Sequence, residues 1–92
     1  MTNTDQARRL SDFLKDAHLA TLNSVRVYGW WEMYDEEEIR LAVTSEIFEL
    51  KRACELRDWH GPHGVLQEAM DCIVVLIKAI LRLQDMAERG EI

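Results

Sequence analysis

The sequence predicts an all-α protein, and three observations carry that prediction. Apolar residues recur at three- and four-residue steps over three long segments, which is the spacing of one side of an α-helix. Glycine and proline interrupt the chain at only three places: Gly29, residues 61–64 and Gly90. No alternating apolar run of useful length indicates a β-strand. We therefore expect a helical bundle built from three long helices.

The first helix is predicted from about Thr4 to Val27. Its apolar stripe comprises Leu10, Phe13, Leu14, Ala17, Leu22, Val25 and Tyr28. The second is predicted from about Asp35 to Trp59 and opens with four acidic residues, 35–38, whose charge suits the unpaired amides of a helix N-terminus. Its apolar stripe comprises Ile39, Val43, Ile47, Leu50 and Cys54. Both segments are amphipathic and each should bury one side.

The third helix is predicted from about Gly64 to Arg89, with Gly90 as its C-terminal cap. Between Cys72 and Ile77 it is apolar on every side, which predicts a position at the centre of the assembly. The short turn around residues 61–62 should make the second and third helices antiparallel neighbours.

Chain length points to a single domain over residues 1–92 that associates with itself. A chain of 92 residues buries only about 60–65% of the surface that its unfolded form exposes, so a monomer would have a thin core. We expect a homodimer in which helices from two protomers complete a four-helix-bundle core, with a homotetramer also open. The two cysteines, Cys54 and Cys72, fall in apolar helical patterns and are expected to be buried free thiols.

Charge and hydropathy exclude several classes of function. The net charge is −6 and the basic residues are scattered, so we expect no nucleic acid polymer as a partner. The stretch Met1 to Leu10 has no apolar signal-peptide core, and the run from Cys72 to Ile77 is too short to span a bilayer. We therefore expect no membrane association and a cytoplasmic location.

Two acidic pairs carry the candidate chemistry. Glu46 and Glu49 are three residues apart on the second predicted helix, and Glu68 and Asp71 repeat that spacing on the third. Residues at i and i+3 share one side of a helix, so each pair projects its carboxylates together. Counted from the turn, the two pairs lie at similar heights on antiparallel helices and can face each other.

Their neighbours place three of these carboxylates inward. Glu46 lies three residues after Val43 and four before Leu50, on or beside the apolar stripe, where a carboxylate must be paired, protonated or bound to metal. Glu68 and Asp71 are likewise flanked by apolar residues. Converging carboxylate oxygens suit a hard cation such as Mg²⁺ or Mn²⁺, with phosphates and waters as further ligands.

Three other residues are candidates for contact with a substrate. Lys78, two helical turns beyond Asp71, could form a buried salt bridge with it or contact a phosphate. Trp30 and Trp31 lie between the first two helices, where they could stack on a base or close the end of the bundle. No glycine-rich phosphate loop, nucleophile elbow or HExxH motif is present, so covalent catalysis is not indicated.

The two stretches that hold the acidic pairs are 41–53, LAVTSEIFELKRA, and 64–76, GVLQEAMDCIVVL. Together they resemble the MazG-like all-α nucleoside triphosphate pyrophosphohydrolases, whose hallmark is ExxE on one helix and ExxD on the next. Eighteen residues separate Glu49 from Glu68 here. The resemblance covers about the middle half of the chain, and it would make residues 1–92 a single MazG-like helical domain.

That resemblance implies a function. Glu46, Glu49, Glu68 and Asp71 would be Mg²⁺ ligands and the catalytic residues, and a nucleoside triphosphate would be split into a monophosphate and pyrophosphate. An alternative is left open, in which the chain is a non-catalytic helical dimer. It would bind a nucleotide or a protein partner and keep the carboxylates as a structural metal site.

Overall fold

The computed structural model describes residues 2–31 and 34–92, and within these ranges it contains three α-helices and no β-strand. Helix α1 spans Asn3–Tyr28, α2 spans Glu36–Leu56 and α3 spans Val65–Glu88. The prediction of an all-α fold with three long helices is confirmed. The largest difference in bounds is at the end of α2, which stops at Leu56 rather than Trp59.

Local chemistry explains where the helices begin and end. Capping boxes start α1, where Thr2 and Asp5 exchange hydrogen bonds, and α2, where Asp35 and Glu38 do the same. Helix α2 ends because the next residue, Arg57, adopts the left-handed conformation at φ +54°. The two other helices are followed by glycines at positive φ, Gly29 directly after α1 and Gly90 one residue beyond the C-cap of α3.

A compact turn joins α2 to α3. The Asp58 side chain accepts a hydrogen bond from the Gly61 amide at 3.0 Å, and its carbonyl accepts one from the Val65 amide at 2.7 Å. A Cβ atom on Gly64 would lie 2.7 Å from the Gly61 nitrogen and 2.8 Å from the Asp58 oxygen. The turn therefore requires glycine at position 64, and it fixes how α2 and α3 align.

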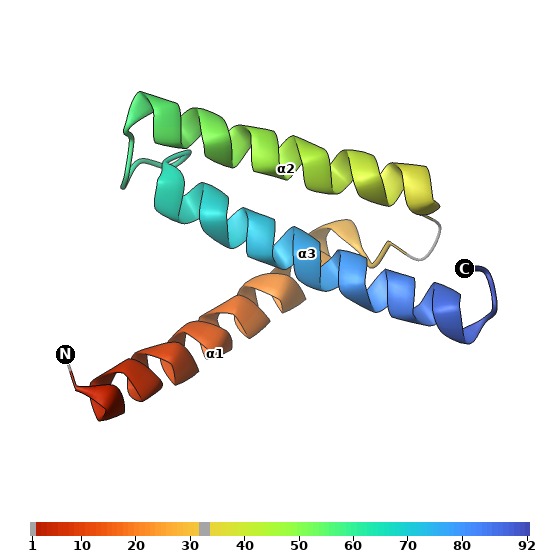
Figure 1. Ribbon diagram of the computed structural model, residues 1–92, viewed down its shortest axis with the longest axis horizontal. Helices are drawn as coiled ribbons and strands as arrows, with labels where there is room; N and C mark the ends of the chain where they lie inside the picture. The colour runs from red at the N-terminus through yellow and green to blue at the C-terminus, as the bar shows by residue number, and fades with distance from the viewer. Residues whose placement is uncertain (1, 32–33) are drawn as a thin grey trace.

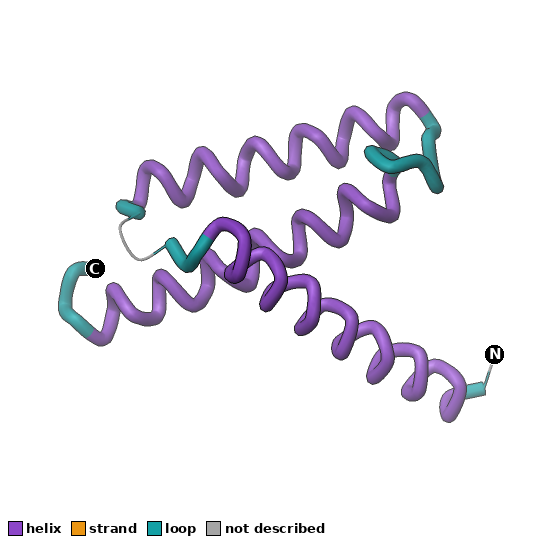
Figure 2. Tube along the Cα trace, turned by 180° about the vertical axis from the view of Figure 1, so that it is seen from behind, coloured by secondary structure: helices purple, strands orange, loops and turns teal. Residues whose placement is uncertain are grey.

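Helix α3 is the central element. It runs antiparallel beside α2 along most of its length, and the C-terminal half of α1 crosses it (Figures 1 and 2). The N-terminal half of α1 projects away from the α2–α3 hairpin (Figure 1). The predicted antiparallel pairing is confirmed, and α3 contacts both other helices of the chain. Its place at the centre of an assembly stays a prediction, and Leu76 is exposed in the single chain. Within the described ranges, no helix combines the length and apolarity that a membrane crossing needs.

The apolar core lies at one end of the hairpin. Ile39, Ala79 and Met86 are buried there, and the partly buried apolar side chains packed against them are Trp31, Tyr34, Val43 and Leu83. In the part of the chain that is described, no large side chain is fully buried. The core is therefore thin, as the length of the chain predicts.

Two residues of the predicted α2 stripe were assigned wrongly. Ile47 is 53% exposed and Cys54 is exposed, whereas Ile39, Val43 and Leu50 are buried or half-buried as predicted. The side of α2 that meets α3 also carries Ala53, which is buried. Ile47 and Cys54 each follow a seam residue by one position, which turns them about 100° away from α3. Of the two thiols, only that of Cys72 is buried.

Candidate metal centre and ligand cavity

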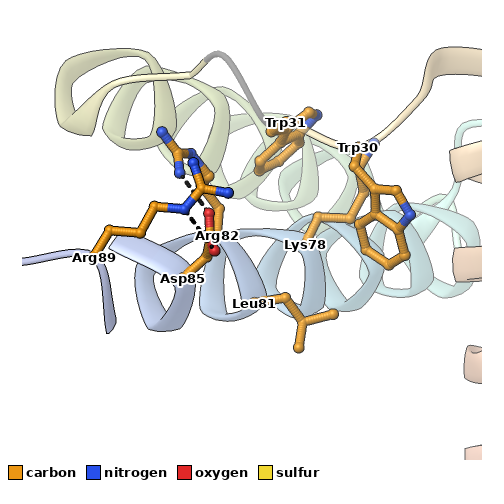
Figure 3. A pocket seen from close by; sticks show the side chains of 7 residues that line it. All are labelled: Trp30, Trp31, Lys78, Leu81, Arg82, Asp85 and Arg89. Carbon is orange, nitrogen blue, oxygen red and sulfur yellow. Dashed lines mark hydrogen bonds and ion pairs between the residues drawn. The ribbon is translucent and has the colours of Figure 1, made fainter. Parts of the chain in front are cut away.

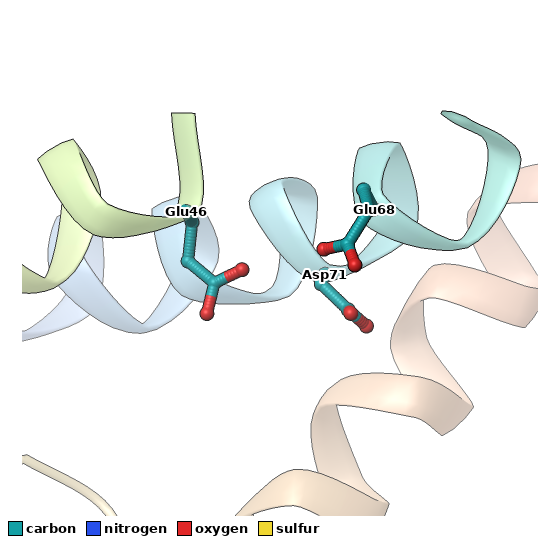
Figure 4. Close-up of side chains that lie close together, drawn as sticks. All are labelled: Glu46, Glu68 and Asp71. Carbon is teal, nitrogen blue, oxygen red and sulfur yellow. The ribbon is translucent and has the colours of Figure 1, made fainter. Parts of the chain in front are cut away.

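Three carboxylates from two helices converge in the half of the hairpin nearer its turn. Glu46 comes from α2, and Glu68 and Asp71 come from α3 (Figure 4). One oxygen from each residue lies within 4.8 Å of the other two. These are the three carboxylates that the apolar neighbours in the sequence predicted to point inward.

The fold places these side chains through ordinary helical spacing. Glu46 occupies the seam position between Val43 and Leu50, so α2 turns its carboxylate toward α3. Glu68 lies in the first turn of α3 and is only 5% exposed. Asp71, one helical turn further on, is half-buried. Because the turn at residues 57–64 brings α3 back alongside α2, the side chains of Glu68 and Asp71 lie next to that of Glu46.

The hydrogen bonds around the cluster leave two buried oxygens without a partner. Gln67 Nε2 donates to Asp71 Oδ1 at 2.9 Å, and Cys72 Sγ donates to the Glu46 carbonyl oxygen at 3.2 Å. Among the described residues, nothing donates a hydrogen bond to the Oε2 atoms of Glu46 and Glu68. A buried acceptor without a donor is destabilising, so these two oxygens suit a ligand that carries positive charge.

The electrostatics of the cluster lead to the same conclusion. Burial raises the pKa of Glu46 and of Glu68, and repulsion from Glu49 and Asp71 raises both further. The pKa of the Cys72 thiol is also raised, first by burial and then by these carboxylates. His63 partly offsets the effect on Glu68, since its Nδ1 lies 3.6 Å from Glu68 Oε1. A bound cation would relieve this repulsion.

Glu49, the fourth predicted ligand, lies outside the group of three. It is exposed and lines a neighbouring cavity of about 480 Å³, together with Glu68, Asp71, Asp58 and His63. The charge of Glu49 is close enough to raise the pKa of Glu46 and of Glu68. The structure thus brings together three of the four predicted carboxylates, with the fourth beside them.

A larger cavity of about 520 Å³ opens on the other side of the cluster. Glu46 and Asp71 form its acidic wall, and α1 supplies the opposite wall with Asn23 and Ser24. Three aromatic side chains also line this cavity: Tyr28, Trp31 and Tyr34. Its volume lies within the range of about 300–1,000 Å³ that is usual for sites of small ligands.

Lys78 lines the same cavity and is 3% exposed. Its Nζ lies 3.4 Å from Ser24 Oγ and 4.7 Å from the centroid of the Trp31 ring, a cation–π geometry. The sequence allowed a salt bridge between Lys78 and Asp71. Both residues are described, and they do not form one. Burial lowers the pKa of Lys78, because the buried ammonium loses contact with water.

The two tryptophans lie in different surroundings. Trp31 stacks on Tyr34 with ring centroids 5.2 Å apart, and it lines the 520 Å³ cavity. Trp30 lines another cavity of about 340 Å³, which Trp31 and Lys78 also line and where Arg82 and Arg89 pair with Asp85 (Figure 3). Of the three predicted substrate contacts, Trp31 and Lys78 therefore lie at the carboxylate cavity and Trp30 does not.

Four polar residues of the site were not predicted. His63 and Gln67 contact the cluster, and Asn23 and Ser24 line the cavity. Gln67 could have been found, because it lies four residues before Asp71 on the same helix. The other three depend on how the turn and α1 pack, which helical periodicity does not encode.

Fold and site together define an all-α protein with an acidic cluster between two helices and a cavity beside it. Comparison with protein-family models, with curated proteins and with solved structures gave no match to this chain.

Proposed function

We propose that this protein is a nucleoside triphosphate pyrophosphohydrolase that depends on Mg²⁺ or Mn²⁺. It would convert an NTP or a dNTP to the monophosphate and pyrophosphate. One observation carries the proposal: buried carboxylate oxygens without hydrogen-bond donors adjoin a cavity that also contains a buried lysine. The resemblance of residues 41–53 and 64–76 to MazG-like motifs is the second support.

The acidic cluster fits a divalent cation of this kind. Glu46, Glu68 and Asp71 would hold it, since they offer carboxylate oxygens alone, the donors that Mg²⁺ and Mn²⁺ prefer. Glu49 would complete the set from the rim of the neighbouring cavity. When bound, the cation would neutralise phosphate oxygens and lower the pKa of a coordinated water.

The chain's other residues suit the substrate side of the reaction. Hydrolysis adds water to the α-phosphorus, breaks the anhydride bond to the β-phosphate and releases pyrophosphate. The Lys78 ammonium would contact the phosphates across the cavity from Glu46 and Asp71, where its poor solvation strengthens the attraction. Trp31, which also lines that cavity, would contact the base or the sugar.

Pyrophosphate release tests the proposal. The purified protein is incubated with common and modified nucleoside triphosphates in the presence of Mg²⁺ or Mn²⁺. We expect release that falls at least about 100-fold in Glu46→Gln, Glu68→Gln and Asp71→Asn. Glu88→Gln, an exposed glutamate on the same helix as two of them, is the matched control and should keep full activity. No release from any of these nucleotides would overturn the proposal.

A second function is favoured by the position of the cluster in the seam. Because Glu46 belongs to α2 and the other two residues to α3, a bound cation would also tie the helices together. The chain would then be a non-catalytic dimer with a structural metal, binding a nucleotide or a protein partner. A rise in melting temperature with Mg²⁺ that Glu46→Gln abolishes, without turnover in the parent, would support this function instead.

The assembly is part of both proposals. We propose a homodimer, or a homotetramer built from such dimers, because the core of a single chain is thin and many large apolar side chains are exposed.

A further inference from the structure

Helix α3 has three apolar sides, and the structure covers two of them. Helix α2 covers the side that carries Cys72 and Ala79, and α1 covers the side that carries Val74 and Lys78. The third side carries four large aliphatic residues at helical spacing: Leu66, Ile73, Leu76 and Ile80. All of these except the half-buried Ile73 are exposed. The central helix therefore lacks a neighbour on one side.

Helix α1 is also only half covered. Ala17 and Thr21 are buried where α1 crosses α3. Leu10, Phe13 and Leu14 continue the same stripe toward the N-terminus and are exposed, because this half of the helix projects from the hairpin (Figure 1). An amphipathic stripe that is buried over half of its length indicates that the other half has a partner elsewhere.

The two uncovered stretches approach each other at a cavity of about 320 Å³. Its lining includes Leu14 and Leu22 from α1, and Ile77 and Leu81 from α3, which directly follow Leu76 and Ile80 in the chain. The exposed members on both helices define what we call the α1–α3 apolar face: Leu10, Phe13, Leu14, Leu22, Leu76, Ile80 and Leu81. Large contiguous apolar surfaces of this kind mark interaction sites.

The exposed area has the size that a second copy would cover. The chain exposes 7050 Å², whereas a folded monomer of 10.8 kDa is expected to expose about 5,500 Å². The excess of about 1,500 Å² per chain corresponds to about 3,000 Å² for two chains, within the range of stable homodimer interfaces. The radius of gyration, 15.1 Å against about 12 Å for a compact chain of this length, shows the same excess.

We propose that a second copy of this chain docks on the α1–α3 apolar face in a two-fold symmetric dimer. In such an interface the same patch of both chains is used, so each chain covers the excess area of the other. The proposal goes beyond the hydrolase activity by naming the surface. It has a consequence for the site, because the helix that carries half of this face also supplies Asn23 and Ser24 to the wall of the carboxylate cavity.

Molecular mass in solution tests the proposal without reference to turnover. Sedimentation equilibrium of the full chain over a wide concentration range should give a dimer. Leu10→Glu and Ile80→Glu each place two charges in a symmetric interface, so we expect each to raise the dimer dissociation constant about 30-fold or more. Leu10 lies in the N-terminal half of α1 and is 58% exposed, so a substitution there disturbs few contacts within the chain.

Two matched controls identify the face. Leu19→Glu changes a leucine of similar exposure on the opposite side of α1, 64% against 58% for Leu10. Leu41→Glu changes an exposed leucine on α2. Both controls should leave the dissociation constant within about threefold of the parent, as expected for residues outside the interface. Helix content from circular dichroism should be the same in all four variants.

Three results would overturn the proposal. One is a parent protein that stays monomeric over the whole concentration range. Another is a dimer that a control variant, Leu19→Glu or Leu41→Glu, dissociates as strongly as the test variants do or more strongly. The third is a dimer that tolerates both Leu10→Glu and Ile80→Glu. Because none of these readouts involves pyrophosphate release, failure here is distinguishable from failure of the proposed activity.

Discussion

The two halves of the seam between α2 and α3 differ in chemistry although one hairpin builds both. At one end, Ile39, Ala79 and Met86 are buried among apolar and aromatic side chains. Toward the other end, Glu46 and Glu68 occupy equivalent inward positions but leave buried oxygens without donors. The apolar half supplies stability, whereas the buried carboxylates of the acidic half reduce it.

This difference separates the residues that hold the fold from those that serve the site. A chain with so thin a core would gain stability from apolar residues at positions 46 and 68. The proposed cation would restore the stability that the burial of these carboxylates removes, which would explain why they are retained. Four predictions sharpen or break that comparison.

The largest effect is expected in the apolar half. Met86→Ala removes a side chain that is 5% exposed, and it should lower the free energy of unfolding by about 2–5 kcal/mol, with or without Mg²⁺. Urea unfolding measures the change. Leu41→Ala, at an exposed position, is the control and should change stability by less than about 0.5 kcal/mol. A negligible loss in Met86→Ala would show that this end of the seam is not the core.

The next effect is that of the cation on the acidic half. Mg²⁺ or Mn²⁺ at about 100 times its dissociation constant should raise the free energy of unfolding by about 2.7 kcal/mol. The melting temperature reports this change, and a chelator should reverse it. Asp71→Asn should show no such gain. Equal stabilisation of parent and variant would mean that the cation binds elsewhere.

A smaller effect is expected from removing a charge in the acidic half. Glu68→Gln should raise the free energy of unfolding of the metal-free protein by roughly 1 kcal/mol near neutral pH, because the buried carboxylate lacks a donor for one oxygen. The same substitution should remove the response to Mg²⁺. Glu88→Gln, on the exposed side of α3, should do neither. Destabilisation of the metal-free protein by Glu68→Gln would contradict the claim that the buried carboxylate lowers its stability.

The smallest effect concerns Lys78 and pH. Its pKa in the folded protein is lowered from 10.5 by burial, so between the lowered value and 10.5 the unfolded chain binds more protons than the folded one. Stability from this group therefore rises with pH across that window. The parent should gain stability relative to Lys78→Met as pH approaches 10.5, measured by urea unfolding. Lys15→Met, at an exposed site, should not reproduce the trend.

Much of the fold and part of the site could be predicted from the sequence because helical periodicity encodes them. Glu46 was placed inward by its spacing from Val43 and Leu50, and the structure confirms that position. The same reasoning failed for Ile47, because apolar residues on α2 lie on two sides and only contact with α3 decides which side is buried.

Other features depend on packing between distant segments. The i, i+3 spacing groups Glu49 with Glu46, and the apolar neighbours of the other three carboxylates set it apart from them. No pattern in the sequence could place Ser24 of α1 at 3.4 Å from Lys78, a contact between residues far apart in the chain. Dimerisation stays a prediction of the chain's length and of its exposed surface.

The turn that requires Gly64 has a consequence for how such a protein can evolve. A side chain at position 64 would meet the Gly61 nitrogen and the Asp58 oxygen, so the turn would have to open and α3 would shift relative to α2. Such a shift would part Glu68 and Asp71 from Glu46, so we expect glycine at position 64 to be kept wherever the three carboxylates are kept.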